Sequence, residues 1–173
     1  MPEIKKHLFL TGEKQVGKST LLRKLIEQKH LDCAGFETQA FYLGNERRGF
    51  TLHGRVEMPP FENDCIVCAR IGEKKSAPVL ETFNQNGVTI LQKSLESTSP
   101  YILMDELGRL ESKAQEFCVQ VLRTLDGEKR VLGVLQKCNS LLIREIMDRP
   151  DVTVLTITPE NREALFETLY KSY

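Results

Sequence analysis

Apolar and polar positions along the chain follow two patterns: short unbroken apolar runs, and longer stretches in which apolar residues recur every three or four positions. The short runs are bounded by turn residues and predict buried strands, whereas the second spacing predicts helices. The expected strands are residues 7–12, 35–43, 48–56, 64–71, 78–83, 101–106, 130–137 and 152–158. The expected helices are residues 17–30, 84–97, 112–125, 140–148 and 159–172. We expect Asn84 to cap the helix that begins there.

Strands alternate with helices along most of the chain, and this order is typical of an α/β fold with a mostly parallel central sheet covered by helices on both faces. One region departs from the pattern. The stretches 35–43 and 48–56 flank a turn at Gly44 and Asn45, which predicts a β-hairpin insertion. The chain has no internal repeat, low-complexity tract or linker, so we expect a single domain over residues 1–173.

A loop with the spacing G-x-x-x-x-G-K-[ST] joins the first expected strand to the first expected helix, within "FLTGEKQVGKSTLL". Strand, glycine-containing loop and helix, in this order, is the context that the motif requires. The backbone N–H groups of such a loop and the positive end of the following helix favour a chain of phosphates. The predicted nucleotide-binding residues of the loop are Gly12, Glu13, Lys14, Gln15, Val16, Gly17, Lys18, Ser19 and Thr20.

Two side chains of the loop have separate predicted roles. Lys18 is expected to reach the β- and γ-phosphates, and we count it among the catalytic residues. Ser19 is expected to ligate Mg²⁺ through its hydroxyl, which makes Mg²⁺ the predicted cofactor.

A pair of carboxylates ends the apolar run 101–104. Four apolar residues place Asp105 at the carboxyl end of the expected strand, where open α/β sheets bind ligands. We expect Asp105 to hold Mg²⁺, through a bound water, opposite Ser19. Glu106 is expected to orient or deprotonate the water that attacks the γ-phosphate, so it is the second predicted catalytic residue.

The stretch "DELG" also fits the D-x-x-G signature of switch GTPases, but the chain contains neither N-K-x-D nor T-K-x-D to read a guanine. The apolar run 130–137 lies between the carboxylates and the last strand. This order favours an ATPase type of sheet, in which an extra strand lies next to the strand of the phosphate-binding loop. Because no other base reader is recognisable, we expect broad base specificity.

The segment "TITPENRE", residues 156–163, follows the last expected strand on the same edge of the sheet. Asn161 and Arg162 could line the base or the sugar of a nucleotide there. The segment is equally well explained as the beginning of a surface helix, so both interpretations stay open.

Composition and charge indicate which partners and which cellular compartment to expect. The formal net charge is zero, from 24 basic and 24 acidic residues, so no basic field indicates nucleic-acid binding. No apolar run approaches the roughly 18 residues that span a bilayer, and the N-terminal residues lack the features of a signal peptide. We expect a cytoplasmic protein whose partners are nucleoside triphosphates, with no membrane contact. The sequence identifies no protein partner.

The chain contains five cysteines, and an odd count without a secretory signal predicts free thiols. Cys65 and Cys68 form a C-x-x-C, but they fall in an expected strand. Residues three apart in a strand point to opposite faces, which suits neither a disulfide nor two ligands of one metal ion.

Several segments, taken in order and spacing, resemble the small nucleoside-triphosphatase family first described from thermophiles, also called the cancer-related nucleoside-triphosphatase family. The matching segments are "FLTGEKQVGKSTL", "GFETQ", "RRGF", "FNQNGVTILQKSL", "DELGRLE" and "NRE". The resemblance covers nearly the whole chain. It implies a P-loop NTPase fold of the RecA-like ATPase type and slow Mg²⁺-dependent hydrolysis of ATP, GTP and other nucleoside triphosphates.

The chain departs from this family in two places. Lys14 and Gln15 stand where the family usually has Pro-Gly, so we expect Gln15 to adopt a backbone conformation that suits glycine better. Residues 39–41, "QAF", stand where the family tends to have charged residues, and no role of those charges carries over.

The sequence is compatible with two alternatives to hydrolysis. A nucleotide or nucleoside kinase on the same fold needs an acceptor site and an arginine-rich lid, to which Arg47 and Arg48 of the expected hairpin could belong. A regulatory module would bind nucleotide tightly with negligible turnover. Release of phosphate without an added acceptor separates hydrolysis from both.

Overall fold

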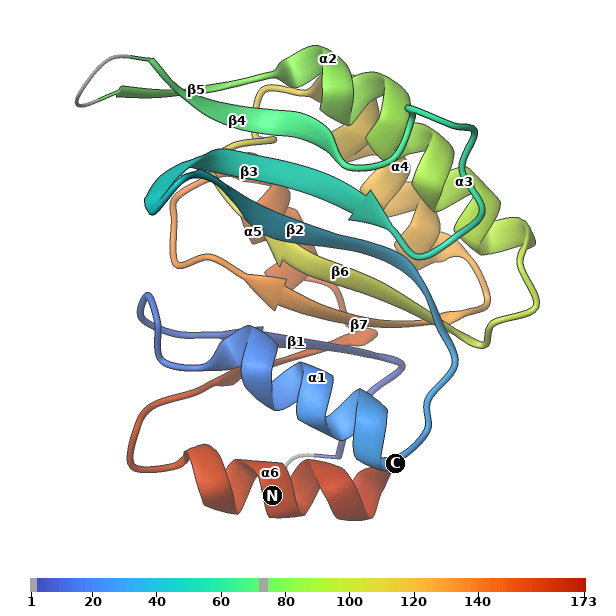
Figure 1. Ribbon diagram of the computed structural model, residues 1–173. Coiled ribbons are helices and arrows are strands. Elements are labelled where there is room, and N and C mark those ends of the chain that lie inside the picture. The colour runs from blue at the N-terminus through green and yellow to red at the C-terminus, as the bar shows by residue number, and fades with distance from the viewer. Residues whose placement is uncertain (1–2, 72–74) are drawn as a thin grey trace.

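One sheet of eight strands organises the part of the chain that the computed structural model describes, residues 3–71 and 75–173 (Figure 1). The strands are β1 His7–Thr11, β2 Cys33–Leu43, β3 Glu46–Gly54, β4 Cys65–Ile71, β5 Lys75–Pro78, β6 Tyr101–Leu107, β7 Arg130–Leu135 and β8 Val152–Thr156. The helices are α1 Lys18–Gln28, α2 Leu80–Thr82, a π-helical turn Phe83–Gly87, α3 Val88–Glu96, α4 Gln115–Asp126, α5 Leu141–Met147 and α6 Arg162–Ser172.

The strand order is β5-β4-β3-β2-β6-β7-β1-β8. Strands β2, β6, β7, β1 and β8 pair in parallel with their neighbours in this order. Strands β3, β4 and β5 extend the sheet with antiparallel pairs, beginning with the predicted hairpin β2–β3. Strand β7 lies between β6 and β1, as expected for the extra strand of an ATPase-type sheet. The carboxyl ends of β1, β2, β6 and β7 therefore meet at one edge. That the whole chain, 1–173, is one domain stays a prediction, which the single sheet supports.

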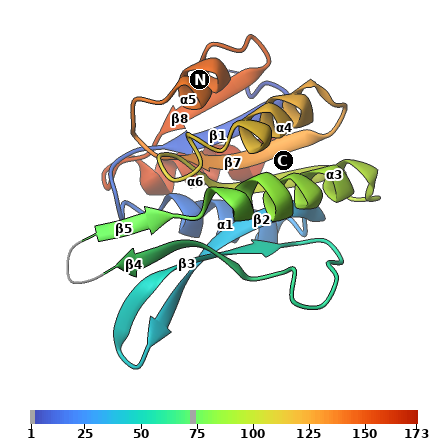
Figure 2. The ribbon, with the colours of Figure 1, turned by 90° about the horizontal axis from the view of Figure 1, so that it is seen from above.

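Helices cover both faces of the sheet, as predicted (Figures 1 and 2). Side chains alternate along each strand, so Leu8 and Leu10 of β1 face one side and Phe9 the other. The first side packs against α1 and α6, and the second belongs to a core that includes Phe117 of α4 and Ile146 of α5. Within the described residues, no helix has both the length and the apolar character needed to cross a membrane.

The prediction of a strand at residues 78–83 is wrong, because Leu80–Thr82 is helical and continues through the π-helical turn into α3. The short apolar run fits the spacing of a strand as well as that of a helix, and packing favours the helix. The Phe83 ring is fully buried, with its centroid 5.3 Å from that of Phe117. Asn84 does not cap a helix. It lies inside the π-helical turn, and its Oδ1 accepts a hydrogen bond from the backbone N–H of Phe117 at 3.2 Å.

All five cysteines are free, in agreement with the prediction of free thiols. Cys65 and Cys68 lie on β4, where Cys68 is buried and Cys65 is partly exposed. In the described ranges of the chain, no group of three or more His, Cys, Asp or Glu side chains could hold a metal ion.

Candidate functional site

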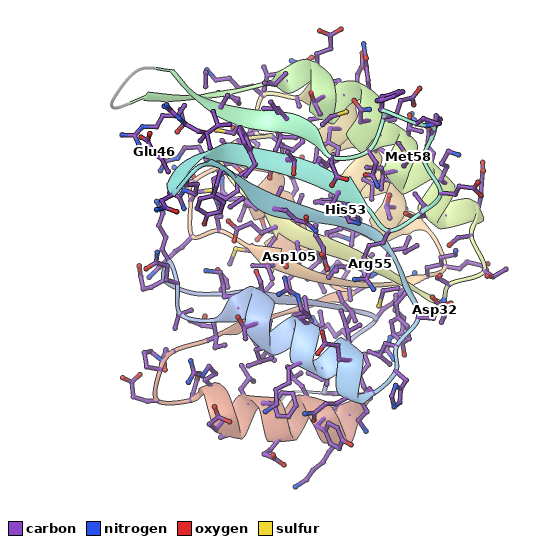
Figure 3. The ribbon with its side chains drawn as sticks, in the orientation of Figure 1. Asp32, Glu46, His53, Arg55, Met58 and Asp105 are labelled. Atoms are coloured by element: carbon purple, nitrogen blue, oxygen red, sulfur yellow. The ribbon has the colours of Figure 1, made fainter. Side chains whose placement is uncertain are left out.

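The loop after β1 and the carboxyl end of β6 meet through a side-chain hydrogen bond. The Ser19 hydroxyl, at the start of α1, donates to Asp105 Oδ1 at 2.7 Å. Asp105 lies beside α1 in the middle of the sheet (Figure 3). The structure thus brings together the two predicted metal ligands, which are 86 positions apart in the sequence.

The backbone of the loop has the conformations that its residues predict. Gly12 has φ +146°, and a Cβ there would lie 2.4 Å from the carbonyl oxygen of Ile157, so no larger residue fits. Gln15 has φ +60°, in the left-handed region that glycine prefers, as expected from its place in the motif. The loop keeps its tight shape even though a glutamine occupies this position.

Lys18 is buried beneath the loop. Its ammonium group donates to the carbonyl oxygens of Gly12 at 3.1 Å and Glu13 at 2.8 Å. An ammonium group has three N–H donors, so two are used within the loop and the third is available to a phosphate oxygen. These bonds hold a positive charge beside the loop, where the sequence predicts that the β- and γ-phosphates bind.

The other loop side chains differ in exposure. Glu13, Lys14 and Thr20 are exposed, whereas Val16 is buried in the core under the loop. The Glu13 carboxylate forms a 2.6 Å ion pair with Lys137, which follows β7. Both partners are largely exposed, so the pair adds little stability.

Asp105 is almost fully buried and lies opposite Glu37 of the neighbouring strand β2. Burial raises the pKa of its carboxyl group to about 6; the hydrogen bond from Ser19 lowers this pKa, and the nearby carboxylates of Glu106 and Glu37 raise it. A cation beside Asp105 would favour the ionised form. The carboxylate and the Ser19 hydroxyl offer the hard oxygen ligands that suit Mg²⁺.

Thr38 of β2 fixes the peptide group between the two carboxylates, a contact that sequence reasoning missed. Its hydroxyl donates to the carbonyl oxygen of Asp105 at 3.0 Å and accepts from the backbone N–H of Glu106 at 3.1 Å. Thr38 is therefore bonded on both sides of this peptide group.

Gln136, which directly follows β7, fixes the Glu106 side chain and was also missed. Its amide nitrogen donates to Glu106 Oε1, and its amide oxygen accepts from the backbone N–H of Arg109 at 3.2 Å. Thr38 and Gln136 share one available signal, since both are polar residues toward the carboxyl ends of parallel strands, where open sheets bind ligands.

A hollow of about 420 Å³ lies beside the loop, between α1 and α6. Its lining residues are Gln15, Gly17, Thr20, Leu21, Lys24, Arg162, Glu163 and Phe166. The Arg162 side chain lies against the loop, with Cδ and Nη1 3.5 Å from where a Cβ of Gly17 would be. The Lys24 ammonium stands 4.0 Å from the centre of the Phe166 ring.

The two residues predicted to contact the base or sugar have different surroundings. Arg162 lines the hollow. The Asn161 amide is used in the turn before α6, where it accepts from the N–H of Thr158 at 2.8 Å and donates to the carbonyl of Thr156 at 2.9 Å. This turn explains why the helix begins at Arg162 and not at residue 159. Contact of either residue with a nucleotide stays a prediction.

Comparison with known proteins gives consistent matches over nearly the whole chain. The sequence model of a family described as NTPase matches residues 7–170. The human cancer-related nucleoside-triphosphatase is 32% identical over 181 residues, covering 92% of each chain. Nucleoside-triphosphatase THEP1 of Thermotoga maritima is 28% identical over 172 residues, covering 94% of this chain and 92% of its own. The crystal structure of THEP1 from Aquifex aeolicus has the same fold, with a TM-score of 0.72 at 23% identity over 94% of this chain and 96% of that one.

Proposed function

We propose that this chain, which belongs to the NTPase family and is a nucleoside-triphosphatase, cleaves the bond to the γ-phosphate with Mg²⁺ in the site. The observation that carries this proposal is the 2.7 Å hydrogen bond from Ser19 to Asp105, because it joins the phosphate-binding loop to the carboxylate pair. The names of the relatives favour hydrolysis over the kinase and the regulatory module.

The triphosphate would lie along the loop, against its N–H groups and the start of α1. The free N–H donor of Lys18 would bond a β- or γ-phosphate oxygen. Ser19 and Asp105 would hold Mg²⁺, because their oxygen atoms are hard ligands that suit this ion. When bound, Mg²⁺ neutralises charge on the phosphates as they react.

Glu106 would act on the attacking water. Its carboxylate accepts a proton from the water as the water oxygen bonds to the γ-phosphorus, and the bond from that phosphorus to the β–γ bridging oxygen breaks. The products are the nucleoside diphosphate and inorganic phosphate. The hydrogen bond from Gln136 leaves one oxygen of Glu106 for the water.

The base and sugar would occupy the hollow between α1 and α6. Its lining is mixed and includes long side chains such as Lys24 and Arg162, which can pack against the flat face of any base. Such contacts do not read the hydrogen-bonding edge that distinguishes one base from another, so we propose broad base specificity. A cytoplasmic location is part of the proposal and is supported by the free thiols.

We expect ATP, GTP, CTP and UTP all to be hydrolysed when Mg²⁺ is present, and release to stop when the ion is removed with a chelator. The measurement is phosphate release without any acceptor, with kcat/KM determined for each nucleotide. A preference above roughly a thousandfold for one base, about 4 kcal/mol, would contradict the proposed base site. Phosphate transfer that requires an added acceptor would favour the kinase instead.

Replacing Gln136 by Leu is expected to lower kcat roughly 10–100-fold and to change KM little, because the amide orients Glu106 and does not lie on the phosphate-binding loop. Gly108→Ala provides a matched test, because a Cβ there would lie 2.1 Å from the Gln136 amide oxygen and displace it without removing a polar group. Steady-state kinetics of both variants should show the same loss in kcat. A raised KM with unchanged kcat would place Gln136 in nucleotide binding.

A further inference from the structure

A second hollow, of about 560 Å³, lies at the tip of the β2–β3 hairpin and against β4 and β5. Its lining residues are Tyr42, Arg47, Arg48, Gly49, Phe50, Arg70 and Ser76. The hydrolytic site described above uses none of them. Three of the described lining side chains are arginines and none of the described ones is acidic, so these side chains give the hollow a positive lining.

The hairpin projects from the same edge of the sheet as the phosphate-binding loop (Figure 1). Glu37 of β2 pairs with Asp105, and Thr38 bonds the Asp105 carbonyl. From Thr38 the strand runs on for four residues to Tyr42, about 13 Å at the usual rise per residue. The hollow is therefore separate from the carboxylate pair but lies toward the same edge of the sheet.

A carboxylate already bridges two of the arginines. Glu46, labelled in Figure 3, lies 3.4 Å from a terminal nitrogen of Arg48 and 3.2 Å from one of Arg70. A phosphate group accepts hydrogen bonds from paired guanidinium groups in the same way and carries more charge. The Glu46 side chain is about half exposed, so it can swing away and leave this place to a ligand.

Two further features favour a phosphorylated ligand with a flat ring. The Nε atom of Arg48 is buried and has no hydrogen-bond partner among the described residues. The Arg47 guanidinium lies over Phe50, 5.3 Å from the ring centre, and Tyr42 is largely exposed. Guanidinium and aromatic planes of this kind stack with nucleobases.

We propose that this hairpin hollow is a second nucleotide site, which binds the phosphate of a nucleoside monophosphate between Arg48 and Arg70 and stacks its base against Tyr42 or the Arg47–Phe50 pair. In the absence of this ligand, Glu46 takes the place of the phosphate. The inference goes beyond hydrolysis and does not depend on it, because binding here uses no residue of the phosphate-binding loop.

The test is calorimetric titration of the full chain with AMP while Mg²⁺ and a non-hydrolysable ATP analogue saturate the loop. The wild type is expected to bind one AMP. Arg48→Ala should weaken binding by about tenfold or more, the usual loss for a hydrogen bond to a charged group. Glu46→Gln should tighten binding several-fold, because it removes the competing carboxylate. A misfolded variant cannot bind more tightly, so the opposite signs separate the proposal from simple unfolding.

Two controls locate the bound AMP. Arg144→Ala removes an exposed arginine of α5 and should leave the affinity unchanged. Lys18→Ala should retain AMP binding, measured without the ATP analogue, because the hairpin hollow does not include the loop. Equal AMP affinity of the wild type and Arg48→Ala, or loss of AMP binding in Lys18→Ala alone, would overturn the proposal. Inorganic phosphate that binds as tightly as AMP would overturn the assignment to a nucleotide.

Discussion

Replacing Glu106 by Gln is expected to lower turnover by roughly 10²–10⁴-fold, the usual contribution of a general base, and to leave the affinity for Mg²⁺–nucleotide close to that of the wild type. Gln has the same size and its amide oxygen can still accept the hydrogen bond from Gln136. It cannot take the proton from the attacking water. Lys18, Ser19 and Asp105 stay in place, so the triphosphate should still bind.

Asp105→Asn is the matched comparison, because it changes the neighbouring carboxylate in the same way. It should weaken the dependence on Mg²⁺ as well as turnover, since a neutral amide holds the ion, or a water bound to the ion, less strongly than a carboxylate does. The measurements are single-turnover hydrolysis and equilibrium nucleotide binding, with Mg²⁺ varied. Hydrolysis of ATP by Glu106→Gln at the wild-type rate would exclude the proposed mechanism and bring the kinase and the binding module back into consideration.

The phosphate-binding loop and the contact between Ser19 and Asp105 could be predicted from the sequence, because the first depends on local structure and the second on the type of sheet. The loop needs only a strand, a glycine-containing turn and a helix, all within residues 7–28. The contact between Ser19 and Asp105 follows from the parallel sheet, which brings the carboxyl ends of β1 and β6 to one edge. The second inference also needs β1 and β6 to lie close together in the sheet, and the order β6-β7-β1 provides this.

The rest of the site depends on contacts that spacing along the chain does not specify. Gln136 reaches Glu106 only because β7 lies next to β6, and Thr38 reaches the same peptide group from β2 on the other side. The prediction of a strand at residues 78–83 is wrong for a related reason. Phe83 packs on Phe117, which lies on another helix, and this tertiary contact outweighs an ambiguous local pattern.

Lys18→Ala should remove most nucleotide binding and turnover, by roughly 10²-fold or more in kcat/KM. One charge-assisted hydrogen bond to phosphate is worth about 1.5–3 kcal/mol, and the lost charge also faces the phosphates as they react. The substitution also leaves the carbonyl oxygens of Gly12 and Glu13 without the donor that now bonds both. The loop is therefore expected to lose part of its shape together with the positive charge.

Lys14→Ala tests whether nucleotide binding and turnover need a positive charge at the position of Lys18 or only somewhere in the loop. Lys14 belongs to the same loop and carries the same charge, but its side chain is exposed. Its removal should change kcat/KM only a few-fold, through the weaker field of an exposed charge. Phosphate release and nucleotide affinity are to be measured for both variants beside their thermal unfolding. Equal losses in the two variants would mean that any positive charge in the loop suffices. Unchanged turnover and affinity in Lys18→Ala would contradict phosphate binding by the loop, because the buried ammonium is the group that the loop holds in place.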